Sequence, residues 1–255
     1  MTIDLSHILP DQVWPFLLTF ARVGAMMMLL PVIGEMMISP RFRLAIALAT
    51  SLLLTPMVAA AVPPMPLTVF GLAGLLISEI VVGIALGGAM RLVMSALQVA
   101  GSVIAMQTGL GFAMAVDPTQ GAQSALISTF LTLLAITLIF ASGMHHLLIG
   151  AVHGSYLLFA PGVLPDSADL LELVVRMVSG AFLLGIQMSA PFLVFGLVFY
   201  LGTGVISKMM PQVQIFFLTM PANILIGFTL LMALLALMMT WFLDRFAADI
   251  GSLAG

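Results

Sequence analysis

Three histidines in one apolar stretch are the first residues whose type and spacing could do chemistry. His145 and His146 are neighbours, and His153 follows His146 by seven residues, which places those two on one face of a helix. Imidazoles so arranged could bind a metal ion or relay protons. The stretch has neither an HExxH pattern nor a nearby carboxylate to act as a base. We therefore expect the histidines to lie at a helix end near the membrane interface, or to make a buried hydrogen bond.

Arg22, Glu79 and Arg91 are ionisable groups inside apolar stretches. Charges are costly in hydrocarbon, so such groups usually face protein or water. They could mark an ion pathway, or they could form a pair between helices, for instance Arg22 with Glu79. A secondary transporter usually offers more acidic groups at mid-depth, so the sequence favours the interhelical pair.

Other chemistry has little support in the sequence. It contains no phosphate-binding loop, nucleophile elbow or dinucleotide fingerprint. It has no cysteine, which excludes disulfides and thiolate chemistry. The net charge of −3 is small and spread out, with no basic stripe for nucleic acid. We therefore predict no enzyme activity, no cofactor, no bound metal ion and no nucleic-acid partner.

The composition indicates a membrane protein. Hydrophobic residues make up 62% of the 255 residues and charged residues only 7%, whereas soluble domains carry about 25% charged residues. No charged side chain occurs between Leu44 and Ser78, between Pro118 and Pro165, or between Met209 and Leu243. One membrane span needs ~20 mainly apolar residues. The sequence thus predicts an all-α polytopic membrane protein of long, kinked apolar helices and helical hairpins.

Continuous rather than alternating apolar runs argue against an outer-membrane barrel. We expect a boundary or bend at Arg91, and breaks at Pro191 and Pro221. The predicted helices cover Asp11–Leu30, Leu44–Val62, Leu67–Met90 with a continuation to Gln107, Gln123–Ala141, Gly143–Phe159, Leu170–Tyr200 and Ile215–Leu243.

One apolar segment does not fit a regular helix. Gly109 to Pro118 holds two glycines and ends in a proline, which disfavours helix.

Basic residues are few, but Arg41 and Arg43 fall in one polar turn and Lys208 in another. The positive-inside rule places both turns on the cytoplasmic side.

The chain resembles the FliR family of flagellar type III export-gate proteins over most of its length, from about Asp11 to Leu243. Four stretches carry the likeness. They are Arg41-Phe42-Arg43-Leu44-Ala45; Glu79, Gly83 and Gly87 at four-residue spacing; Gln107-x-Gly109-Leu110 through Asp117-Pro118-x-x-Gly121-x-Gln123; and Pro211-Gln212-x-Gln214-x-Phe216 followed by Pro221.

The resemblance implies a structural role in a complex. Proteins of this family join two smaller partners, FliP and FliQ, in a closed helical tube that admits unfolded export substrates, with FlhB and FlhA nearby. The location implied is the bacterial inner membrane at the flagellar basal body. Residues 1–165 are expected to be similar to FliP, and residues 166–255 to form a helical hairpin similar to FliQ.

The resemblance also implies site residues. A plug loop at about residues 108–118 would close the lumen with Gly109, Leu110, Gly111, Phe112, Ala113, Met114, Asp117 and Pro118. Helix packing and partner contact would fall to Arg41, Arg43, Glu79, Gly83, Gly87, Gln107, Gln123, Lys208, Pro211, Gln212, Gln214 and Pro221.

Other functions stay open at this point. A related subunit of a virulence needle complex would share most of these stretches. A secondary transporter for a small solute or ion would have broken helices in an inverted repeat, and inspection reveals none. An intramembrane enzyme built on the histidines is the least favoured alternative.

Overall fold

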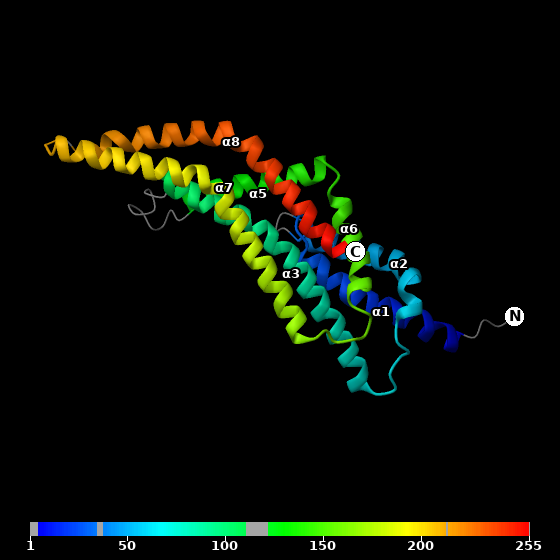
Figure 1. Ribbon diagram of the computed structural model, residues 1–255. Helices are drawn as coiled ribbons and strands as arrows, with labels where there is room; N and C mark the ends of the chain where they lie inside the picture. Colours follow the sequence, from blue (N-terminus) through cyan, green and yellow to red (C-terminus); the bar gives the residue numbers. More distant parts are fainter. Residues whose placement is uncertain (1–4, 35–37, 111–121, 213, 255) are drawn as a thin grey trace. The chain divides into compact units, whose positions relative to one another are not determined.

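Apolar helices make up the fold in the computed structural model, which describes residues 5–34, 38–110, 122–212 and 214–254. No strand occurs in these ranges. In chain order the helices are α1 (Leu5–Leu29), α2 (Pro40–Val58), a 3-10 turn (Ala59–Ala61), α3 (Val69–Gln107), α5 (Ala122–Ala141), α6 (His145–Leu158), α7 (Ser167–Met209) and α8 (Ile215–Ala254). The predicted all-α class is confirmed (Figure 1).

Four helical segments are long and apolar enough to cross a membrane, and α5 with α6 adds a fifth if they form one broken span. Helices α3, α7 and α8 have 39, 43 and 40 residues. At 1.5 Å per residue each is about 60 Å long, roughly twice the ~30 Å hydrocarbon thickness. The chain is therefore a multi-pass membrane protein whose longest helices exceed a single span.

The breaks expected at Pro191 and Pro221 are wrong, because α7 and α8 pass through these prolines without ending. Of the two outcomes expected at Arg91, a boundary is also wrong, because α3 passes through this residue. Arg91 is exposed on its helix and is a good helix former, so its charge requires no break. A proline removes only one backbone donor, and continuing the helix keeps the other backbone groups paired. The predicted helix end at Tyr200 is also wrong, because α7 continues to Met209.

Helix α2 begins four residues earlier than predicted. Ser39 is its N-cap, with the Ser39 hydroxyl accepting a bond from Phe42 N at 3.4 Å. Pro40 follows at the first helical position, where its missing N–H costs nothing. The Ser-Pro pair is the sequence signal for this boundary. Arg41 and Arg43 accordingly lie in the first turn of α2, rather than in a turn before it.

The helices form two compact units. Unit 1 comprises Met1–Val93, Gly143–Val178 and Ala247–Gly255, and unit 2 comprises Met94–Ser142 and Ser179–Phe246. Within unit 2, α7 and α8 run side by side as an antiparallel hairpin (Figure 1). The units interleave along the chain. The expected division at residue 165 rests on likeness to partner subunits, and it stays a prediction.

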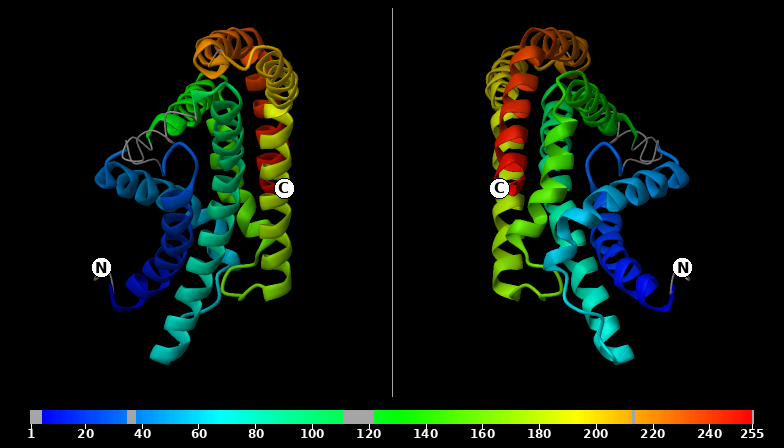
Figure 2. Two further views of the ribbon diagram at one scale, coloured as in Figure 1. Left: turned by 90° about the vertical axis from the view of Figure 1, so that its left-hand side faces the viewer. Right: turned by 90° about the vertical axis from the view of Figure 1, so that its right-hand side faces the viewer.

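Close packing of α1 on α3 organises unit 1 (Figure 2). A Cβ atom built on Gly83 would lie 2.5 Å from the Arg22 carbonyl oxygen, and one on Gly87 would lie 2.7 Å from that of Met26. Met26 itself is fully buried. These glycines let the two backbones approach more closely than any larger residue allows.

We expect Gly83→Val to destabilise the protein by about 1–3 kcal/mol, because the added atoms force α1 away from α3. The matched control is Gly88→Ala on the same helix, where an added Cβ meets nothing within 4 Å. Thermal unfolding in mild detergent measures both. Equal melting temperatures for the two variants would contradict the packing argument.

Candidate functional site

A buried ion pair lies at the centre of unit 1. Arg22 of α1 and Glu79 of α3 are 0% and 1% exposed. Arg22 Nε donates to Glu79 Oε2 at 2.6 Å, and Arg22 Nη2 donates to Oε1 at 3.2 Å. This two-pronged geometry is the strongest arrangement available to a guanidinium and a carboxylate. The interhelical pair predicted from the sequence is present.

The pair is also tied to the backbone around α6. Arg22 Nη1 donates to the carbonyl oxygens of Ser155 and Phe159 at 3.0 and 2.8 Å. The N–H of Gly162 donates to Glu79 Oε1 at 2.6 Å. The Arg22 guanidinium lies 4.3 Å above the Tyr156 ring. One charge pair thus joins α1, α3, α6 and the loop that follows α6.

We expect Arg22→Ala to cost about 3–5 kcal/mol of stability, because it leaves the Glu79 carboxylate buried without its cation. Glu172 and Arg176 of α7 provide the control: they pair at 2.5 Å, yet their side chains are 69% and 72% exposed. Arg176→Ala should cost no more than about 0.5 kcal/mol. Chemical denaturation of the two variants in detergent measures the difference, and similar losses would refute the special role of the buried pair.

The second notable arrangement is in unit 2, at the end of α3. The chain turns at Gly109, whose φ of +80° is a left-handed conformation that favours glycine. The N–H of Gly109 donates to Met106 O at 3.3 Å, and that of Thr108 donates to Ile104 O at 2.9 Å. These bonds close the last helical turn directly before Leu110.

Asn223 of α8 contacts this turn. Its side chain is 3% exposed, and Nδ2 donates to the carbonyl oxygen of Gln107 at 3.2 Å. Carbonyls in a last helical turn have no partner within their own helix. Asn223 therefore caps α3 from a different helix. Its other amide atom, Oδ1, is buried without a hydrogen-bond partner among the described residues.

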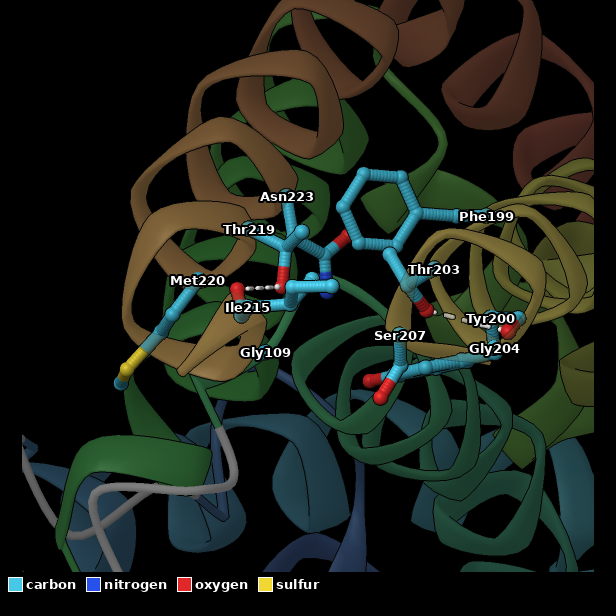
Figure 3. A pocket seen from close by; sticks show the side chains of 10 residues that line it. All are labelled: Gly109, Phe199, Tyr200, Thr203, Gly204, Ser207, Ile215, Thr219, Met220 and Asn223. Atoms are coloured by element: carbon cyan, nitrogen blue, oxygen red, sulfur yellow. Dashed lines mark hydrogen bonds between the residues drawn. The ribbon is translucent and has the colours of Figure 1, made fainter. Parts of the chain in front are cut away.

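A pocket of about 250 Å³ opens beside the capped turn (Figure 3). Phe199, Tyr200, Thr203, Gly204 and Ser207 line it from α7. Ile215, Thr219, Met220 and Asn223 line it from α8, and Gly109 completes the lining. The Thr203 and Thr219 hydroxyls donate to carbonyls of their own helices. The lining is mixed, with apolar side chains beside hydroxyl and amide groups.

The other expected site residues lie at several places. Gly109 and Leu110 belong to the capped turn, whereas Gly111, Phe112, Ala113, Met114, Asp117 and Pro118 lie outside the described residues. Gln123 is in the first turn of α5. Lys208, Pro211, Gln212, Gln214 and Pro221 are exposed around the turn of the α7–α8 hairpin. Arg43 donates to the Ile38 carbonyl, and Arg41 is exposed.

His145 and His146 take a helix-end position, as expected, whereas His153 lies within α6. His145 and His146 begin α6, and their rings are 4.1 Å apart. His146 Nδ1 is 2.9 Å from the Gly143 carbonyl oxygen. Across the described parts of the chain, no three histidine or acidic residues gather where a metal ion could be held.

Asn223 was not selected as a site residue from the sequence, because it was only one of many amides in apolar helices. An isolated Asn in a long apolar helix is the available signal, because a buried amide requires a partner. The identity of that partner could not be inferred from chain positions more than a hundred residues apart.

Comparison with known proteins extends over nearly the whole chain. The family described as bacterial export proteins, family 1, matches residues 13–248. The chain is 42% identical over 236 residues to the flagellar biosynthetic protein FliR of Caulobacter vibrioides, covering 92% of this chain and 94% of the relative. It is 28% identical over 224 residues to FliR of Escherichia coli, covering 88% and 84%. It is 27% identical over 219 residues to FliR of Bacillus subtilis, covering 85% and 84%.

Proposed function

This chain belongs to the bacterial export proteins of family 1, and from that membership we propose that it is a structural subunit of a flagellar protein-export gate. The 42% identity to a FliR protein and the long apolar helices make the chain a membrane component of the flagellar export apparatus. The relatives are named for flagellar biosynthesis and export rather than for an enzyme activity.

The proposed subunit works within an assembly. The chain joins FliP and FliQ in a closed helical channel in the inner membrane, through which unfolded flagellar proteins leave the cell, with FlhB and FlhA close by. The many large apolar side chains exposed along α7 and α8 support contacts beyond this chain, because lipid or other subunits must cover them. Residues 166–255 would serve as the FliQ-like hairpin, and residues 1–165 as the FliP-like part.

Purification of a tagged copy from its native cell in gentle detergent tests the assembly. We expect the protein in a large particle with both smaller helical partners. Recovery alone, or as a small homo-oligomer, from cells that express those partners would refute the proposed channel.

The gate itself is assigned to the predicted plug loop. A seal must exclude water and ions, yet open to about the width of an extended chain. Apolar side chains such as Leu110, Phe112 and Met114 can close a constriction by dewetting it, and glycines allow the backbone to move. The single observation that best supports this location is the left-handed turn at Gly109, which ends a 39-residue helix just before the apolar segment.

We expect deletion of Gly109–Met114 to make cells leaky to small solutes, because the apolar closure of the channel is lost. Uptake of a normally excluded dye or sugar measures the leak, with co-purification of the partners as the control for assembly. Unchanged permeability in an assembled complex would contradict the plug assignment.

A further inference from the structure

The end of α3 is enclosed by the hairpin of unit 2. A methyl group built on Gly196 of α7 would overlap the Gln107 side chain, and one on Gly227 of α8 would overlap the side chain of Thr108. Thr108 is 1% exposed. An added side chain on Gly227 would press on Thr108 down to its Cα atom, whereas one on Gly196 would have to displace the Gln107 side chain. The two hairpin helices thus pack against this turn at Gln107 and at Thr108.

Asn223 supplies the direct polar contact with that turn. Asn223 Nδ2 donates to Gln107 O at 3.2 Å, which links α8 to the backbone at the end of α3. A Cβ atom on Gly109 would come within 3.0 Å of the same Nδ2 atom. The Asn223 amide therefore lies against the turn at Gln107 and at Gly109, where the chain changes direction.

Stability alone would not favour this amide. One amide hydrogen bond contributes little net free energy, and the buried Oδ1 atom, which has no partner among the residues that the structure describes, adds a desolvation cost. A well-packed leucine of similar size avoids that cost. The feature that leucine cannot reproduce is a directional bond fixing the exit of the chain from α3.

We infer that Asn223 is a positioning residue, which fixes Gln107–Leu110 to the α7–α8 hairpin and thereby sets the base of the seal. The inference rests on the proposed gate function for its last link. It adds that the seal depends on a residue more than a hundred positions away in the chain. Movement of the hairpin would be passed to the base of the seal through this amide, together with the packing of Gly196 on Gln107 and of Gly227 on Thr108.

The test uses Asn223→Leu in the full-length protein, purified with whatever partners accompany it. Hydrogen exchange at the amides of Thr108 and Gly109 should become about tenfold faster, because the outside cap on the turn is lost. The control is Thr240→Val, an exposed position of α8 whose hydroxyl bonds only to Ala236 O of its own helix. It should leave exchange at the turn unchanged.

Solute uptake by cells carrying Asn223→Leu gives the second readout, with the Gly109–Met114 deletion as the reference for a fully open seal. We expect uptake above wild type and below the deletion. Unchanged exchange would overturn the inference, and so would faster exchange without uptake when the deletion leaks. A deletion that does not leak would instead refute the gate function, and the sealing role of Asn223 with it.

A second variant, Gly109→Ala, replaces Asn223→Leu in both measurements if the Asn223 variant does not accumulate in cells. It crowds the same amide from the opposite side and strains the left-handed turn, without changing either hairpin helix. The same rise in exchange and in uptake is expected. Wild-type values for both measurements in this variant would also overturn the inference.

Discussion

The pairing of Arg22 with Glu79 is the constraint on which unit 1 depends. A chain with 62% hydrophobic residues has little polar surface to spare, yet it places two opposite charges where neither contacts solvent. Such charges are tolerable only when their hydrogen-bonding groups are occupied. The carbonyls of Ser155 and Phe159 and the N–H of Gly162 complete that requirement, so the pair fixes backbone as well as side chains.

The same requirement acts at the end of α3, but on neutral groups. A helix that ends in apolar surroundings leaves carbonyls that water cannot reach. Asn223 supplies the donor for Gln107 from another helix, and Gly196 and Gly227 leave room for the side chains of Gln107 and Thr108. Long apolar helices thus acquire defined ends through a few polar contacts.

Much of this arrangement could be predicted from the sequence, and there are physical reasons why the rest could not. Charge-free runs predicted the helices, and the isolation of Arg22 and Glu79 in such runs predicted their pairing. The helix breaks predicted at Pro191 and Pro221 do not occur, because losing one backbone donor costs less free energy than ending a helix in an apolar environment. The role of Asn223 escaped because it depends on tertiary contact between α8 and α3, which no local pattern encodes.

The last nine residues have a consequence for biosynthesis. Residues 247–255 belong to unit 1, where Ile250 and Leu253 are buried, although most of that unit comes from the first 93 residues. Ribosomes deliver the chain from its N-terminus, so unit 1 stays incomplete until residues 247–255 have been made. Unit 2, whose segments are already present by then, can close first. Early-made apolar surface must therefore be sheltered by lipid, by the insertion machinery or by neighbouring subunits throughout synthesis.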